Sequence, residues 1–460
     1  MAMQKFESLR DRLAKLTPVR PFGRVVGAES ACLKVAGLNG YARIGDHLRL
    51  TRSDGVDVGG EVVQLAPDGL IMLPDNRLEG IAVGNKVFVE PDTGLAPCDA
   101  WIGRIIDPYG VPLDGKPMQP GAQVYALDAP PPPPAQRKKL GDRMDTGMVL
   151  FNTILPLARG QRIGIFAGSG VGKTSLLAHF ARHMEAEVVV IALVGERGRE
   201  LREFIDEALG PQGMQRSIVV AATSDRSALV RRRCPAAATA IAEYFRDQGR
   251  QVLLLTDSIT RFAEAHREVA TTSGELPALR GYPPSMSHSV MSLCERAGPG
   301  TQDQGDITAI YTVLVAGSDM DEPVADVLRG VLDGHVTMDR AIAERGRFPA
   351  VDILRSVSRS LPGCATDRQN DRIATARKYL GAFAEAETMV RAGLYADGSD
   401  LVLDQALVIH DRLDALAAQV ETGGIDASFE KLERLLAEAE AYRGRSGRGS
   451  QQLVTPPGSQ

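Results

Sequence analysis

A glycine-rich loop with a single lysine carries the strongest chemical signal in the sequence. Residues 167–174 read Ala-Gly-Ser-Gly-Val-Gly-Lys-Thr, after a strand-like run that ends at Phe166. Glycines let the backbone N–H groups of such a loop converge on phosphates, and a following helix N-terminus adds partial positive charge. The sequence therefore predicts a nucleotide-phosphate site, with contacts expected from Ala167, Gly168, Ser169, Gly170, Val171, Gly172, Lys173, Thr174 and Ser175.

Two side chains of this loop are expected to perform separate tasks on bound ATP. Lys173 would neutralise the β- and γ-phosphates, and the hydroxyl of Thr174 would ligate Mg²⁺. Ala167 stands where such loops usually begin with glycine, and a methyl group is tolerated there if the residue has a negative φ. A chance glycine-rich turn is the alternative, but it would lack the flanking strand-like and helical runs.

Two acidic residues follow apolar runs and could serve the same site. Asp257 ends the run Val252-Leu-Leu-Leu-Thr-Asp, so it could hold Mg²⁺ through water, or instead cap a helix that begins at Ser258. Glu196 follows another apolar run. Parallel strands end at one edge of a sheet, which is where a base that activates water must lie. Glu200 competes for this role, and a surface salt bridge remains open for either glutamate.

Three arginines are candidates for contact with the γ-phosphate. The forked guanidinium groups of Arg197, Arg261 and Arg359 suit charge spread over phosphate oxygens. Composition alone does not separate them from arginines that are merely solvated. The run Arg231-Arg232-Arg233 favours a solvated surface or a subunit contact.

An α/β domain with a mainly parallel sheet is expected to position these residues. Between about 150 and 360, runs rich in Val, Ile and Leu alternate with helical runs, and we expect this nucleotide-binding domain over residues 151–361. The strands that we expect are 162–166, 188–194, 218–222, 251–255 and 307–314.

The rest of the chain divides into segments of different character. Short alternating runs broken by Gly, Asp and Pro predict a small β-barrel or sandwich over 20–92. Residues 93–150 are expected to be a linker and entry to the core, with a proline run at 130–134. Helices are expected over 362–445, most clearly Asp371–Glu387 and Phe429–Tyr442, and a disordered tail over 446–460.

The first segment, residues 1–19, is expected to hold a short amphipathic helix. Phe6, Leu9, Leu13 and Leu16 fall on one stripe of residues 4–16, and charged residues lie elsewhere. Such a stripe needs a partner surface.

Bulk composition excludes several classes of protein. The formal net charge of −5 over 460 residues gives no global attraction to nucleic acid. The five cysteines are scattered and odd in number, so neither a disulfide framework nor a zinc site is indicated. The chain begins without a basic segment followed by an apolar one, and no long apolar run follows, so we expect a cytoplasmic protein.

Taken in order, five segments resemble the catalytic subunits of rotary ATPases and their secretion relatives. Around residues 145–162 and 195–200 the chain is most similar to the flagellar protein-export ATPase, and closely also to the injectisome ATPase of type III secretion. This resemblance implies a RecA-like P-loop core with an N-terminal small β-barrel and a C-terminal helical domain. The segments are 168–174, 194–200, 255–263, 281–285 and 356–359.

The resemblance also implies roles for individual residues. Glu196 would be the general base that polarises the attacking water, supported by Arg197 and Arg261. Phe348 would stack on adenine, although a plain core residue is the alternative reading. Arg359 would be the arginine finger. Together these roles imply an ATPase that uses ATP and Mg²⁺.

Glu196 and Arg359 coexist in this one chain, which has consequences for assembly. The resemblance implies that base and finger come from neighbouring subunits, so a homo-oligomer, expected as a hexameric ring, is the economical interpretation. It further implies a stator-like regulatory protein at the N-terminal helix, contacts with an export gate, chaperones and exported proteins, and peripheral association with the inner-membrane export apparatus.

Two other classes of function share parts of this pattern. A RecA-like ring that translocates RNA would need a basic, aromatic platform near the N-terminus, whereas Phe22, Tyr41 and Phe88 lie among abundant acids. A nucleotide-binding structural subunit without turnover is disfavoured by Glu196, which such subunits of the resembling family replace. The sequence does not decide whether such an ATPase would serve a flagellum or an injectisome.

Overall fold

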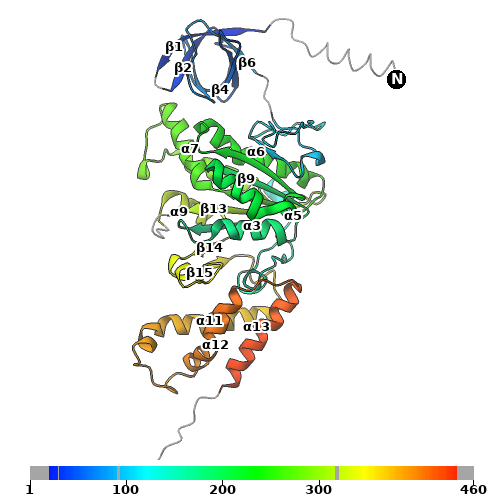
Figure 1. Cartoon of the computed structure of the whole chain (residues 1–460), viewed down its shortest axis with the longest axis vertical. Coiled ribbons are helices and arrows are strands. Elements are labelled where there is room, and N and C mark those ends of the chain that lie inside the picture. The colour runs from blue at the N-terminus through cyan, green and yellow to red at the C-terminus, as the bar shows by residue number, and fades with distance from the viewer. Residues whose placement is uncertain (1–19, 30, 91–93, 316–320, 443–460) are drawn as a thin grey trace, which may run out of the picture.

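The chain forms a barrel, a central α/β unit and a helical unit, which follow one another along the longest axis of the molecule (Figure 1). The computed structural model describes residues 20–29, 31–90, 94–315 and 321–442. The fold class expected from the sequence is confirmed. The helix expected over 4–16 and the tail over 446–460 lie outside the described residues.

The N-terminal unit is a closed six-stranded barrel, which decides between the barrel and the sandwich. Its strands are joined in the order β1-β2-β5-β4-β3-β6. Alternating apolar residues such as Leu33, Val35, Leu48 and Leu50 point inward and are buried. The strands are β1 (Phe22–Glu29), β2 (Cys32–Ala36), β3 (His47–Thr51), β4 (Asp57–Ala66), β5 (Gly69–Pro74) and β6 (Lys86–Val89).

The central unit is built on a sheet with the path β15-β14-β8-β13-β11-β9-β10-β7, and β12 pairs with β13. All pairs along the path are parallel except β14 with β15. The five strands expected from the sequence are all present. The strands are β7 (Ile105–Ile106), β8 (Arg162–Ala167), β9 (Val188–Glu196), β10 (Ser217–Thr223), β11 (Val252–Asp257), β12 (Gly298–Pro299), β13 (Asp306–Leu314), β14 (Gly334–Met338) and β15 (Val351–Ser358).

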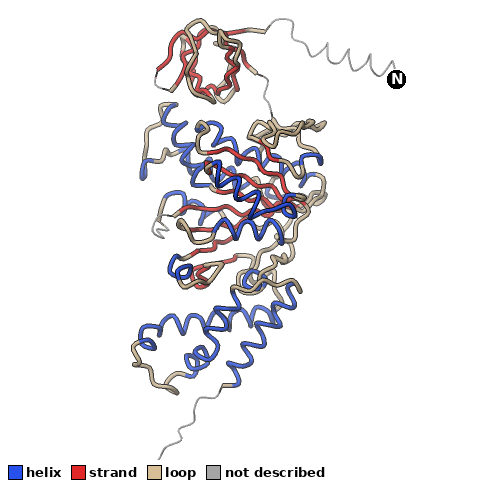
Figure 2. The backbone as a smooth tube through the Cα atoms, viewed as in Figure 1, coloured by secondary structure: helices blue, strands red, loops and turns tan. Residues whose placement is uncertain are grey.

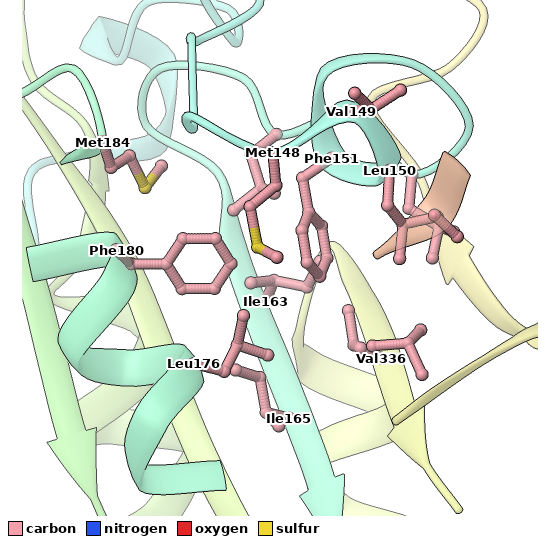
Figure 3. Packing of buried hydrophobic residues seen from close by; sticks show 14 of the residues in the cluster. Met148, Val149, Leu150, Phe151, Ile163, Ile165, Leu176, Phe180, Met184 and Val336 are labelled. Carbon is pink, nitrogen blue, oxygen red and sulfur yellow. The ribbon is translucent and has the colours of Figure 1, made fainter. Parts of the chain in front are cut away.

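Helices cover both faces of this sheet (Figure 2). On one face Leu176 and Phe180 of α3 pack against Ile163 and Ile165 of β8 (Figure 3). Helices α6 to α9 cover the other. The helices are α2 (Val149–Asn152), α3 (Lys173–His183), α4 (Gly198–Glu203), a π-helical turn (Phe204–Leu209), α5 (Gly210–Met214), α6 (Ala228–Asp247), α7 (Ile259–Thr272), α8 (Ser285–Glu295), α9 (Pro323–Val331) and α10 (Arg340–Glu344), with 3-10 turns at Asp99–Trp101, Pro134–Gln136 and Leu279–Gly281.

The C-terminal unit consists of α11 (Asp367–Arg391), α12 (Leu401–Ala417) and α13 (Gly424–Ala441). Of the two clearest helices expected from the sequence, the first lies within α11 and the second ends one residue beyond α13. Helix α11 begins with a capping box, in which the side chains of Thr366 and Gln369 satisfy each other's backbone N–H groups. Within the described residues, none of the helices combines the length and the apolar character that crossing a membrane requires.

The arginine run at the start of α6 is not a merely solvated surface, so that part of the expectation was wrong, whereas a subunit contact stays a prediction. Arg232 donates to both carboxylate oxygens of Glu61 in the barrel, at 2.6 and 2.8 Å. Arg231 pairs with Glu268, and the guanidinium of Arg233 lies 4.5 Å from the ring centre of Tyr109. The run thus ties the central unit to the barrel and to the segment that follows it.

Candidate active site

The glycine-rich loop connects β8 to α3, as its sequence predicts. Strand β8 ends at Ala167 and α3 begins at Lys173. Gly170 and Gly172 have φ of +78° and +87°, which an L side chain rarely adopts. Ala167 is buried in the strand, and within the described ranges Arg280 is the sole residue other than glycine with positive φ, so the methyl group of Ala167 is tolerated.

Asp257 reaches the loop from the end of β11. Lys173 Nζ lies 2.5 Å from Asp257 Oδ1, and the hydroxyl of Thr312 on β13 donates to the same oxygen at 2.7 Å. The cap of α7 comes from Ser258, whose hydroxyl accepts from Arg261 N, so Asp257 has no capping role. Asp257 is therefore available to a site that forms around Lys173.

Thr312 was missed by the sequence reasoning. Its signal was a hydroxyl residue within the otherwise apolar part of β13, but its value depends on β13 lying beside β11. The hydroxyl orients the Asp257 carboxylate toward the lysine. Only the strand order, which joins segments far apart in the chain, reveals this contact.

Glu196 ends β9, the neighbour of β11, and its carboxyl group is perturbed. Burial raises its pKa to about 7, the negative charge of Asp257 and a hydrogen bond with Glu200 act in the same direction, and Lys173 opposes them. The same hydrogen bond holds the pKa of Glu200 below its usual value. Glu196 and Glu200 thus form a hydrogen-bonded pair of acids, in which Glu196 holds its proton more tightly than Glu200.

These groups share a cavity of about 480 Å³ at the carboxyl edge of the sheet. The loop residue Thr174, the candidate base Glu196 and the candidate metal ligand Asp257 therefore line the same cavity, as a site for phosphoryl chemistry requires. Acidic and apolar side chains of the segment 200–208 form the opposite wall. The lining residues are Thr174, Leu193, Glu196, Glu200, Leu201, Glu203, Phe204, Glu207, Ala208 and Asp257.

Arg197 and Arg261 lie on the same edge as Glu196. The side-chain carbons of Arg261 pack against Gly195, where an added Cβ would be 3.5 Å away, and its guanidinium pairs with Glu264 at 3.2 Å. Arg197 is exposed and lies 3.5 Å from Glu200. Both guanidinium groups therefore pair with glutamates of this edge of the sheet.

Arg359 lies at the opposite edge of the sheet. Strand β15 runs antiparallel to β14, so Val351 pairs with Met338 at the loop edge, whereas Ser358 pairs with Gly334. Arg359 N donates to Asp333 O, five residues before Met338 on the β14 side. At roughly 3.3 Å per residue, Arg359 stands about 17 Å along the sheet from the edge that holds its own loop. Its guanidinium donates to the carbonyl oxygens of Leu332 and Arg329, each at 3.2 Å.

Phe348 lies over the glycine-rich loop. Its ring carbons come within 3.1 and 3.3 Å of the position that a Cβ on Gly172 would take. The side chain is 52% exposed, which excludes the alternative that it is a plain core residue. A half-exposed aromatic face beside a phosphate loop is suited to stacking on a base.

The donor set fits Mg²⁺ that arrives with a nucleotide. The Thr174 hydroxyl and the Asp257 carboxylate open into one cavity, and oxygen donors are those that Mg²⁺ prefers. Across the described ranges no three His, Cys, Asp or Glu side chains form a group that could hold a metal by itself. Mg²⁺ typically keeps waters and takes substrate phosphates as further ligands, which agrees with so few protein donors.

Two family models match the chain. Residues 147–358 match the ATP synthase alpha/beta family, nucleotide-binding domain, and residues 365–434 match the T3SS EscN ATPase C-terminal domain. The first match spans the loop, Glu196, Asp257 and the strand before Arg359. The second spans α11 and α12 and most of α13.

Similar proteins cover nearly the whole chain. The flagellum-specific ATP synthase of Caulobacter vibrioides is 40% identical over 438 residues, which are 93% of this chain and 99% of the relative. The type 3 secretion system ATPase of Xanthomonas euvesicatoria is 40% identical over 89% of this chain and 91% of its own. EscN from enteropathogenic E. coli, assembled and in complex with its central stalk EscO, superposes with a TM-score of 0.82 at 35% identity, covering 90% of this chain and 100% of EscN.

Proposed function

Because this chain belongs to the family of flagellum-specific ATP synthases and type III secretion ATPases, and is an ATPase, we propose that its ATP hydrolysis energises protein export through a flagellar type III secretion apparatus. The observation that carries the hydrolytic part is that Thr174, Glu196 and Asp257 line one cavity, while Lys173 donates to the Asp257 carboxylate. Injectisome export is the second candidate, because a type 3 secretion system ATPase is also 40% identical to this chain.

Export of flagellar proteins in cells that lack this chain separates the two candidates. We expect flagellar export to be lost, restored by the wild-type chain, and not restored by Lys173→Ala, because phosphate binding depends on that lysine. Normal flagellar export together with lost injectisome secretion would transfer the assignment to the injectisome.

The chain's own residues divide the work of hydrolysis. The loop amides and Lys173 hold the β- and γ-phosphates of ATP, and Glu196 accepts a proton from the attacking water. Thr174 and Asp257 would hold Mg²⁺, which supplies positive charge against the phosphate oxygens. Arg197 and Arg261 support Glu196 and the γ-phosphate, and the Phe348 ring stacks on the adenine.

A ring of identical subunits completes the site. Arg359 and the loop lie at opposite edges of one sheet, so a single copy cannot bring them together, whereas a head-to-tail neighbour can. The EscN relative is described as assembled, which supports an oligomer. A hexamer gives each loop one Arg359 from the next subunit.

The pKa of Glu196 predicts a pH profile. A base must be deprotonated to accept a proton, and burial raises the pKa of this carboxyl to about 7. We expect kcat/KM to fall about tenfold per unit as pH decreases below this value, and to level off above it, because kcat/KM reports the free enzyme. A profile that stays flat from about pH 6 to pH 8 would contradict the assignment of Glu196 as the base.

Truncation of Phe348 should act on binding. Phe348→Ala removes the aromatic face over Gly172, and stacking of a base on an aromatic ring contributes about 1–3 kcal/mol. We expect KM for ATP to rise about 10-fold with kcat nearly unchanged, and Phe348→Tyr to behave as the wild type. Steady-state kinetics measure both KM and kcat, and a loss confined to kcat would refute a stacking role for Phe348.

The N-terminal segment and the other partners complete the proposal. A stator-like regulatory protein binds the apolar stripe of residues 4–16, and the chain works in the cytoplasm at the membrane export apparatus, with its gate, chaperones and exported proteins. Removal of residues 1–18 should abolish binding of that regulator and leave ATP turnover within about twofold, since the site lies elsewhere. Unchanged regulator binding, measured by titration calorimetry, would refute this role.

A further inference from the structure

The residues on either side of Arg359 are buried although Arg359 itself is exposed. The hydroxyl of Ser358 donates to Pro156 O at 2.6 Å, and the hydroxyl of Ser360 reaches the same oxygen at 3.3 Å. The two hydroxyls also lie 2.8 Å apart. A buried hydroxyl keeps its partner because an unsatisfied one is costly. The backbone that carries Arg359 is therefore clamped on both sides.

Gln161 connects this clamp to the first residue of β8. It is fully buried, and its side-chain NH₂ donates to Ser358 Oγ and to Asp333 O, each at 3.0 Å. Its side-chain oxygen accepts from Ala158 N at 2.9 Å. All of these contacts have good length, so the amide is locked in one orientation.

Asp333 joins the same two elements a second time. Its backbone oxygen accepts from Arg359 N at 2.9 Å as well as from Gln161. Its carboxylate accepts from the backbone N–H and the guanidinium of Arg162, the first residue of β8. The start of β8 and the segment that carries Arg359 are thus both hydrogen-bonded to Asp333.

Strand β8 leads from this network to the chain's own phosphate loop. It begins at Arg162 beside Gln161 and ends at Ala167. One end of the strand therefore lies at the loop that binds a nucleotide in this subunit. The other end supports the arginine that this subunit offers to its neighbour.

We propose that Gln161 and Ser358 are positioning residues for Arg359. They hold this arginine, which serves the neighbour's site, against the start of β8, the strand that ends at the chain's own phosphate loop. The inference rests on the proposed function, because it takes Arg359 as acting in the neighbour.

Gln161→Leu and Ser358→Ala test the proposal against a matched control. Ser217→Ala also removes a fully buried hydroxyl that donates to a carbonyl, at 2.7 Å, at the same edge of the sheet but on β10. We expect kcat to fall about 10- to 100-fold in the first two variants, since misplacement of a catalytic group by about 1 Å has this effect, with KM within about twofold. Ser217→Ala should stay within about twofold of the wild type.

Mixed rings separate an effect on Arg359 from an effect on the chain's own loop. Each variant is co-expressed with Lys173→Ala under two different tags, and rings are purified through both. In such a ring, the phosphate loop of a Gln161→Leu subunit can face the intact Arg359 of a Lys173→Ala subunit. Together they form a complete site if Gln161 acts through Arg359. We therefore expect mixed rings with Gln161→Leu or Ser358→Ala to exceed both parents in phosphate release.

Arg359→Ala mixed with Lys173→Ala keeps the two proposals distinguishable. If this mixture gains activity but the Gln161→Leu and Ser358→Ala mixtures do not, the positioning role is wrong and the shared site stands. If the Arg359→Ala mixture fails as well, the site between subunits is wrong, and the positioning role falls with it. Ser358→Ala keeps the test informative should Gln161→Leu fail to fold.

Discussion

Replacing Glu196 with glutamine should lower the steady-state rate of phosphate release by about 10²- to 10⁴-fold, the usual contribution of a general base. Glutamine has the same shape but cannot accept the proton of the attacking water. The loop and Lys173 remain, so nucleotide affinity should stay within about twofold. Phosphate release and equilibrium binding of a fluorescent nucleotide together measure both effects.

A matched acid on the same cavity provides the control. Glu203 lines the cavity but pairs with Arg199 at 2.7 Å on the exposed surface of α4. Glu203→Gln should therefore turn over at nearly the wild-type rate. Turnover by Glu196→Gln within a few-fold of Glu203→Gln would exclude Glu196 as the base and revive Glu200.

Replacing Arg359 with alanine should lower kcat by about 10³-fold or more, because an arginine finger contributes about 10³- to 10⁵-fold. Binding of nucleotide should be unchanged, because Arg359 lies at the edge opposite its own loop. Arg368→Ala removes an exposed arginine that pairs with Glu433 on α13, and it should have little effect. The measurements are again phosphate release and equilibrium binding.

Weaker nucleotide binding by Arg359→Ala, with kcat preserved, would contradict this role. It would show that Arg359 contributes to binding in the ground state, rather than to the transition state. The mixed rings with Lys173→Ala then show whether any such contribution comes from the neighbouring subunit.

The strands were the most predictable part of the fold. Buried parallel strands are near-continuous apolar runs, and runs such as 188–194 and 307–314 leave little other interpretation. Alternation in short segments such as Cys32–Ala36 predicted strands with one buried face, but not how the sheet closes. Closure depends on pairing of β1 with β6, whose residues are far apart in the sequence.

Within the site, the residues at strand ends were predictable and their interactions were not. Glu196 and Asp257 follow from the rule that parallel strands end at one edge. The hydrogen bond between Glu196 and Glu200 depends on how the chain turns into α4, so spacing alone left the two as rivals. The position of Arg359 depends on β15 being antiparallel, which no local pattern encodes.

Charge patterns were the least reliable guide. Three consecutive arginines indicate a solvated surface on composition alone, yet Arg231, Arg232 and Arg233 each have a partner within the chain. Their partners come from α7, from the barrel and from the segment after it. A run of like charges shows neither which residues face it nor whether they belong to the same subunit.

The most direct measurement is a structure of the assembled ring with Mg-ADP and a planar mimic of the transferring phosphate, such as aluminium fluoride. We predict that Lys173 and Thr174 of one subunit surround the phosphates, that the Glu196 carboxyl holds the water opposite the mimic, and that Arg359 of the next subunit reaches it. A mimic bound with Glu196 directed away from that water, or with Arg359 still on the carbonyl oxygens of Arg329 and Leu332, would contradict a hydrolytic site shared by two copies of this chain.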